Sequence, residues 1–236
     1  MPLFQQPFMS GGFPSMNRAV VSPWDFDDDF DTDLGWTHTG TGNDVDTGNS
    51  QLDWDLERKA SHEGSYLDTS TMFGGNFSDT AWICRWWAVN FSTVADNTSA
   101  PYLACLDTAG ADMEDSIDAI SFVFGETFGA GTNKIRIEEN IAGSRSNTSQ
   151  DYAWTSSTDY YCELRRTSAT NVTANFSSTS GFTKDLVGDF SETVSSSCGG
   201  FDYLQVGNDH AGSSTGRTNI GTLGRVQCMQ NTDTAP

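Results

Sequence analysis

The sequence predicts an all-β protein: a two-sheet antiparallel sandwich preceded by an extended N-terminal arm. Hydrophobic residues make up only 36% of the 236 residues, while aromatic residues make up 12%. This combination is typical of antiparallel sandwiches, because half of each strand faces water while aromatic side chains fill the space between the sheets. Clusters of Gly, Ser, Thr, Asn and Asp separate short apolar stretches along the chain. We therefore expect an arm over 1–23, one β domain over 24–230 and a tail over 231–236.

The arm contains four of the six prolines of the protein. Proline has no backbone N–H, so the segment is neither a helix nor an inner strand. It also lacks the basic start and continuous apolar core of a secretory signal, from which we expect assembly in a cytoplasm. A disordered leader is the alternative to docking on a neighbouring subunit. The docking interpretation rests on the large apolar side chains Phe4, Phe8, Phe13 and Met16.

The domain begins with the acidic run Asp-Phe-Asp-Asp-Asp-Phe over residues 25–30. Strand alternation would place Phe26, Asp28 and Phe30 inward. Residues 52–59 also alternate as a strand, and no stretch shows sustained helical periodicity. Within the long strand predicted for 82–91, Trp82 and Trp86 share one face. The remaining predicted strands are 101–106, 119–124, 134–138, 159–165, 171–176, 202–206 and 224–229.

Charge excludes one class of partner. The chain has 32 Asp and Glu against 12 Lys and Arg, a formal net charge of -20, and such a surface repels nucleic acid. No stretch approaches the roughly 20 apolar residues needed to span a bilayer.

The five cysteines have no metal-ligand spacing, and their odd number argues against a full disulfide framework. Four of them, Cys84, Cys105, Cys162 and Cys228, lie in apolar runs and are expected to be buried. Cys198 lies in a Ser-rich stretch and is expected to be exposed. A disulfide is the alternative to five free thiols.

The order of several segments resembles a known pattern. It runs from the acidic strand and Gly35-Trp36 through Ser-Asp-Thr-Ala-Trp-Ile-Cys-Arg-Trp-Trp at 78–87 to Tyr-Leu-Gln-Val-Gly-Asn at 203–208. This order is similar to concanavalin A-like, laminin-G-like jelly rolls of phage, archaeal-virus and marine metagenomic surface proteins. The resemblance covers roughly residues 24 to 229 and implies a jelly-roll sandwich. Family members often have Gly-x-Leu-Asp-Asp in the last strand, where this chain has Gly221-Thr-Leu-Gly-Arg.

The resemblance raises the question of glycoside hydrolysis, which needs two carboxylates roughly 5 Å apart in retaining enzymes. Glucanases of this fold carry three acids on one strand. The nearest segment here supplies Glu114 and Asp118 but lacks the third acid, and Glu138 and Glu139 point to opposite strand faces. We therefore expect a protein that is not an enzyme.

No cofactor is expected, apart from a candidate Ca²⁺ site. Carboxylate oxygens suit Ca²⁺, and the candidate ligands are Asp27, Asp28 and Asp29. A buried Asp28 would need a partner or an ion. The alternative is a solvated acidic edge that prevents strand-to-strand aggregation.

Lectin sites of this fold stack sugars on aromatic rings and bind hydroxyls with Asp and Asn. Because Trp87 lies on the strand face opposite Trp82 and Trp86, at least one Trp is expected in a groove. The candidate carbohydrate-binding residues are Trp36, His38, Trp54, Trp87, Asn208, Asp209 and His210.

Together these observations predict a non-enzymatic virion structural protein, a capsid-decorating, coat or fibre component. The arm would dock on copies of the chain or on other virion proteins, giving an oligomer. The acidic sandwich would face outward on the virion surface, extracellular in the mature particle. The alternative is a carbohydrate-binding, lectin-like module that recognises a host or environmental glycan.

Overall fold

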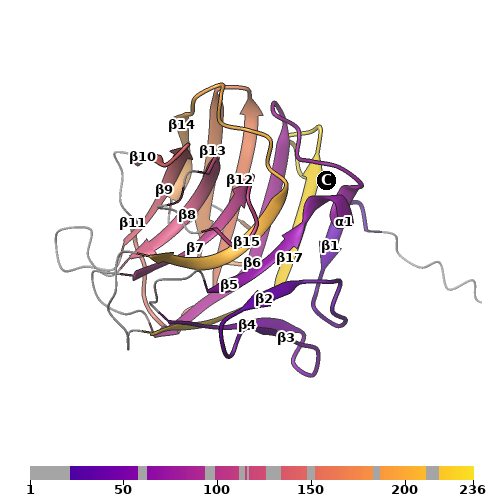
Figure 1. Ribbon diagram of the computed structural model, residues 1–236, viewed down its shortest axis with the longest axis vertical. Coiled ribbons are helices and arrows are strands. Elements are labelled where there is room, and N and C mark those ends of the chain that lie inside the picture. The colour runs from indigo at the N-terminus through magenta and orange to yellow at the C-terminus, as the bar shows by residue number, and fades with distance from the viewer. Residues whose placement is uncertain are drawn as a thin grey trace, which may run out of the picture.

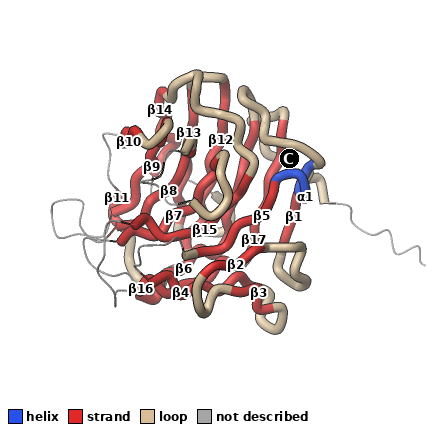
Figure 2. The backbone as a smooth tube through the Cα atoms, in the orientation of Figure 1, coloured by secondary structure: helices blue, strands red, loops and turns tan. Residues whose placement is uncertain are grey.

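In a computed structural model, the described residues of the chain form a β-sandwich with one short helix (Figures 1 and 2). No helix within the described ranges is long and apolar enough to cross a membrane. The predicted arm residues Phe4, Phe8, Phe13 and Met16 lie outside the residues that the structure describes. Those residues are 22–57, 63–93, 99–111, 115, 117–125, 134–147, 152–182, 187–210 and 218–236.

Two sheets form the layers of the sandwich, with nine and eight strands among the described residues. The first sheet contains β1 (Phe26–Asp28), β3 (Asp44–Asp46), β4 (Gln51–Glu57), β6 (Trp82–Thr93), β12 (Tyr160–Ser168), β13 (Asn171–Ser177), β14 (Val187–Thr193), β16 (Thr218–Leu223) and β17 (Arg225–Gln230). The second contains β2 (Thr37–Thr39), β5 (Gly64–Asp68), β7 (Ser99–Leu106), β8 (Ala119–Gly125), β9 (Lys134–Ile141), β10 (Ser144–Asn147), β11 (Tyr152–Ala153) and β15 (Tyr203–His210).

The strand order is β14-β13-β12-β6-β16-β4-β3 in the first sheet and β10-β9-β8-β7-β15-β5-β2 in the second. Strand β6 is shared on one side by two partners, first β17 and then β16. The change of partner occurs where the Gly224 N–H donates to the Trp87 carbonyl at 2.9 Å. The final strand β17 also pairs with the first strand β1, so both ends of the domain meet in one sheet. The predicted two-sheet sandwich is therefore confirmed.

The core between the sheets is dominated by aromatic rings. Trp82 and Trp86 are fully buried, and the Trp86 ring meets Phe122 of the opposite sheet edge to face at 6.2 Å. Residues Phe26 and Phe30 also point inward, as predicted, although Phe30 lies after the end of β1 with a φ of 60°. Trp82 and Trp86 thus lie on one face of β6, as the period of two of a strand predicts.

The cysteines are all free and buried. This confirms the prediction for the four that lie in apolar runs. The expectation that Cys198 is exposed is wrong, because its thiol lies 3.7 Å from the Ala119 carbonyl and 3.8 Å from the Asn140 carbonyl. Burial raises the pKa of this thiol.

The outer face of the second sheet is covered by the connection between β7 and β8. Tyr102 donates its hydroxyl proton to the Ala111 carbonyl at 2.7 Å, and the Gln205 carboxamide binds the same carbonyl at 2.7 Å. The side chains of Ala111 and Ile117 complete a second apolar cluster on this face. Ala111 and Ile117 of this connection therefore pack against the sheet face.

Sequence periodicity did not reveal α1 (Thr69–Phe73), the one helix in the described part of the chain, because it is a single turn. Its N-cap is Asp68, whose side chain accepts the Ser70 N–H at 2.7 Å. Its C-cap is Gly74, which is left-handed with φ of 73° and donates its N–H to the Ser70 carbonyl. Figure 1 places α1 beside β1 and the C-terminus.

Candidate functional site

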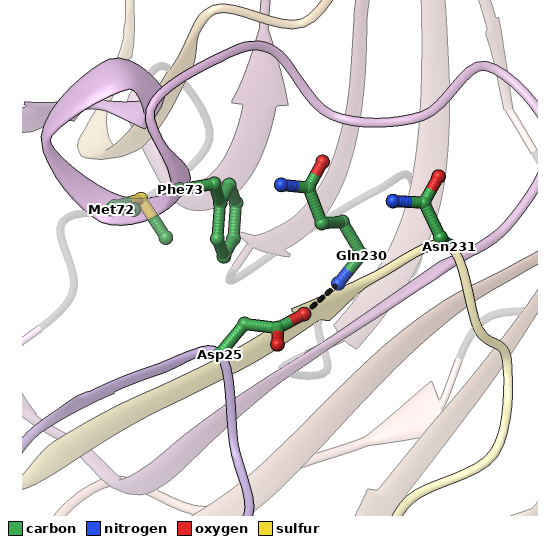
Figure 3. A pocket seen from close by; sticks show the side chains of 5 residues that line it. All are labelled: Asp25, Met72, Phe73, Gln230 and Asn231. Carbon is green, nitrogen blue, oxygen red and sulfur yellow. Dashed lines mark hydrogen bonds between the residues drawn. The ribbon is translucent and has the colours of Figure 1, made fainter.

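A polar hollow of about 410 Å³ lies between α1 and the paired ends of β1 and β17 (Figure 3). We call it the α1–β17 pocket. Its lining combines one carboxylate, two carboxamides, an aromatic ring and a thioether. The lining residues are Asp25, Met72, Phe73, Gln230 and Asn231.

The aromatic wall of the pocket is held in place by a chain of rings that reaches the core. The Phe73 ring meets Phe77 at 5.1 Å, and Phe77 meets the fully buried Trp82 at 5.3 Å. The Phe77 N–H also donates to the Phe201 carbonyl at 3.1 Å. The orientation of Phe73 is therefore set by packing rather than by a free rotamer.

The polar side of the pocket is built where the first and last strands meet. Asp25 precedes β1, and its carboxylate accepts the backbone N–H of Gln230 at 2.9 Å (Figure 3). Asn231 follows β17 with a φ of 60°, in the left-handed region that Asn adopts more readily than most residues. This turn of the chain directs the Asn231 side chain to the same hollow as Gln230.

Several polar atoms in the pocket have no hydrogen-bond partner within the described part of the chain. Among the described residues, one Asp25 carboxylate oxygen and the side-chain amides of Gln230 and Asn231 make no hydrogen bond. A carboxylate accepts hydrogen bonds, whereas a carboxamide both donates and accepts them. The pocket can therefore bind a ligand rich in hydroxyl groups, with the Phe73 ring offering an apolar face.

Three of the predicted carbohydrate-binding residues belong to the interior, which corrects their assignment to a sugar site. Trp36 is 5% exposed and Trp54 is 2% exposed, so neither ring has a face open to a ligand. Asn208 is also buried, and its side-chain oxygen accepts a hydrogen bond from Asn219 at 2.9 Å. Their role is packing and the satisfaction of buried polar groups.

The other predicted carbohydrate-binding residues do not converge with the pocket. His38 is half-buried and bonds Ser65 at 2.8 Å, and burial lowers the pKa of its imidazole. Trp87 is half-buried on the outer face of the first sheet, where its indole N–H donates to Gln227 at 2.8 Å. Asp209 and His210 continue strand β15, and their side chains lie outside what the structure describes.

The predicted calcium ligands do not share one site either. Asp27 faces outward, where its two carboxylate oxygens accept hydrogen bonds from Arg225, each at 2.6 Å. Asp28 faces inward and binds the indole N–H of Trp36, while Asp29 is exposed. Within the described ranges, no three His, Cys, Asp or Glu side chains are grouped so that they could hold a metal ion. A buried Asp28 was predicted to need either a protein partner or an ion, and Trp36 is the protein partner.

Sequence reasoning did not assemble the α1–β17 pocket. Asp25 stood in the acidic run, but nothing linked it to Phe73, Gln230 or Asn231, which come from distant segments. The one local signal is the Asp68 cap with Gly74 five residues after Thr69, which marks a short helical turn.

Comparison with known proteins supports the fold. No protein-family model and no curated protein sequence matches the chain. Among solved structures, it is similar to the GH43 protein BlXynB from Bacillus licheniformis, with a TM-score of 0.57, 12% identity, and coverage of 86% of this chain and 39% of that one. It is similar to the VIP36 exoplasmic/lumenal domain in its Ca²⁺/Man3GlcNAc-bound form, with a TM-score of 0.55, 9% identity, and coverage of 90% and 93%.

A third similar structure is the CBM2 module of the evolved Dit of Lactobacillus casei BL23 phage J-1. Its TM-score is 0.53 at 16% identity, with coverage of 87% of this chain and 94% of that one. The chain spans 39% of the length of the GH43 structure but nearly all of the other two. The chain therefore has the concanavalin A-like jelly-roll fold, and at these identities the likeness establishes the fold alone.

Proposed function

We propose that the chain is a carbohydrate-binding domain whose sugar ligand occupies the α1–β17 pocket. The observation that carries this proposal is that an aromatic ring and three polar side chains with unpaired atoms line one polar hollow. A sugar ring has an apolar C–H face and a rim of hydroxyls, so Phe73 would pack on the face while Asp25, Gln230 and Asn231 bind the rim. The pocket volume of about 410 Å³ lies in the range of small-molecule sites.

The likeness to solved structures points in the same direction. The VIP36 domain is seen with Man3GlcNAc, and the phage Dit structure is a CBM2 module. Most small-molecule pockets are lined mainly by apolar groups, whereas the walls here are mostly polar. A polar lining favours a polyhydroxylated ligand over an apolar one.

We further propose that the domain binds its sugar without cleaving it. Glycoside hydrolysis generally uses two carboxyl groups, and Asp25 supplies the single carboxylate that the described residues place in the pocket lining. Glu138 is 3% exposed and its carboxylate is held by Arg145, while Glu139 accepts the Ser195 N–H at 2.6 Å. Asp118 accepts the Ala142 N–H at 3.1 Å, and Glu114 lies outside the described residues.

The test begins with the purified chain on a glycan array, followed by calorimetry with the best ligand. Gln230→Ala removes one carboxamide from the pocket and should weaken binding about three- to tenfold, the effect of one hydrogen bond. The matched control is Thr222→Ala, a similar truncation on β16 outside the pocket lining. Failure to bind any glycan, or equal affinity of the Gln230 variant and the wild type, would contradict the proposal.

A second candidate function is that of a virion structural component, which the likeness to a phage Dit module favours. In this proposal the arm anchors the domain to copies of itself or to other virion proteins, and the sugar pocket faces outward. Ser22 donates its hydroxyl proton to Asp27, and the Trp24 ring covers the Arg85 guanidinium at 5.1 Å. A chain that starts at residue 22 therefore keeps every described contact of the domain.

That truncated chain gives a clean test of the arm. Light scattering should show an oligomer for the full chain and a monomer for the truncated one, with the same melting temperature for both. The same mass for both chains would refute a role of the arm in assembly and leave the sugar-binding proposal untouched.

A further inference from the structure

The charge of the α1–β17 pocket narrows the class of sugar that it can accept. Among the residues that the structure describes, Asp25 is the only ionisable one in the lining, and no described Lys, Arg or His lines the hollow. A carboxylate, sulfate or phosphate group on a glycan is bound most strongly by such a cation, because hydrogen bonds between ionised groups are about twice as strong as neutral ones. Without one, an anionic sugar would bring its charge against that of Asp25.

The surroundings of the pocket strengthen this bias. Five more aspartates follow Asp25 within residues 26–33, and the whole chain has a net charge of -20. In the same run the carboxylate of Asp27 is neutralised by Arg225, whereas Asp25 has only a backbone N–H as its partner among the described residues. The negative charge of Asp25 therefore stays available to a ligand.

We infer that the pocket selects sugars by charge, preferring a 2-amino sugar, accepting a neutral one and rejecting uronic and other acidic sugars. This inference rests on the proposed function. The ammonium group of an amino sugar would donate to the unpaired oxygen of Asp25, while Gln230 and Asn231 bind its hydroxyls. Because Asp25 is exposed, the preference is modest: about threefold in affinity for each step from acidic to neutral to amino sugar.

The experiment uses methyl glycosides of gluco, galacto and manno configuration, each in its neutral, 2-amino and uronic acid form. They are titrated into the ¹⁵N-labelled full chain near neutral pH and low salt, and NMR follows the side-chain amide signals of Gln230 and Asn231. These two signals report on the pocket itself. In the configuration that binds, the amino form should bind most tightly and the uronic acid least, and added salt should reduce the difference.

Two variants distinguish the effect of the charge in the pocket from the effect of the net charge of the chain. Asp25→Asn keeps an oxygen that can accept the Gln230 N–H but removes the charge, so the ranking by charge should disappear. Asp29→Asn removes the same charge from an exposed position outside the lining, so the ranking should persist.

Three other outcomes would overturn the inference, and each refutes a different part of it. A uronic acid that binds as tightly as the amino sugar refutes charge selection while leaving sugar binding intact. Equal loss of the ranking in both variants assigns it to the net charge of the chain instead of the pocket. The absence of any response at Gln230 and Asn231 to all of these sugars refutes the proposed function as well.

Discussion

The buried carboxylate of Asp28 offers a sharp test of what holds the first strand in place. Asp28 is 2% exposed, and its two oxygens accept the Trp36 indole N–H and the Phe30 backbone N–H, each at 2.8 Å. Burial raises the pKa of this carboxyl above its ordinary value of 3.8, and the two hydrogen bonds offset part of that rise. Loss of the indole donor would therefore leave a buried carboxylate with one of its two hydrogen bonds.

The perturbation is Trp36→Phe, which keeps an aromatic ring beside Phe30 but deletes the donor. Leaving a buried charged acceptor without its partner costs about 2 to 3 kcal/mol, and the smaller ring adds roughly 1 kcal/mol of lost packing. We expect the free energy of unfolding to fall by about 3 kcal/mol near neutral pH. A single domain commonly has only about 5 to 15 kcal/mol in total, so the change is large.

The pH dependence of the free energy of unfolding distinguishes the cost of the unpaired charge from the cost of lost packing. With its pKa raised in the folded state, Asp28 holds more proton when folded than when unfolded between pH 3.8 and that raised value. Its contribution to stability is therefore lost as the pH rises through this window and is regained in acid. The variant raises the folded pKa further, so its deficit should be largest near neutral pH and shrink below about pH 4.

Urea unfolding of the wild type and Trp36→Phe at both pH values measures the effect, with the double variant Asp28→Asn/Trp36→Phe as the control. The neutral Asn should recover part of the deficit near neutral pH, because the uncompensated charge is gone. A deficit of the same size at both pH values would refute the reasoning and assign the whole cost to the smaller ring.

Two further predictions follow from the packing of the sheets. Gly221→Ala should lower the free energy of unfolding by about 1 to 3 kcal/mol in urea unfolding, because its Cβ would lie 2.2 Å from the Asn90 carbonyl oxygen and 2.4 Å from the Trp54 indole nitrogen; an unchanged midpoint would show that β16 and β6 separate at no cost. The five cysteines should not react with a thiol-specific reagent in the native chain, since each is buried, and all five should react in denaturant. Rapid native labelling of Cys198 would contradict its place in the core.

The strands that could be predicted are those in which apolar and polar residues alternate over five or more positions. Strand β12 and its neighbour β13 are examples, because a period of two is a local property of the chain. Strands β2, β3 and β10 have three or four mostly polar residues, and β11 has only two residues, so the pairing of all four depends on the partner strand. Strand β14 and strand β16 were missed for lack of regular alternation.

Local composition also misjudged exposure where a distant segment covers a residue. Cys198 stands among serines, but strands β8 and β9 pack over it. Trp36 and Trp54 looked like candidates for stacking on a sugar, yet both lie between the sheets. Periodicity shows which side chains share a face, but whether that face is inside depends on what packs against it.

The sequence by itself determined the all-β class, the antiparallel sandwich, the inward orientation of Phe26 and the burial of four cysteines, because each follows from local alternation and composition. Only the tertiary structure decided the site. Asp25, Phe73 and Gln230 meet because β1 pairs with β17 and a one-turn helix closes over their ends. Contacts between residues some 200 positions apart depend on how the sheets close, which no local pattern encodes.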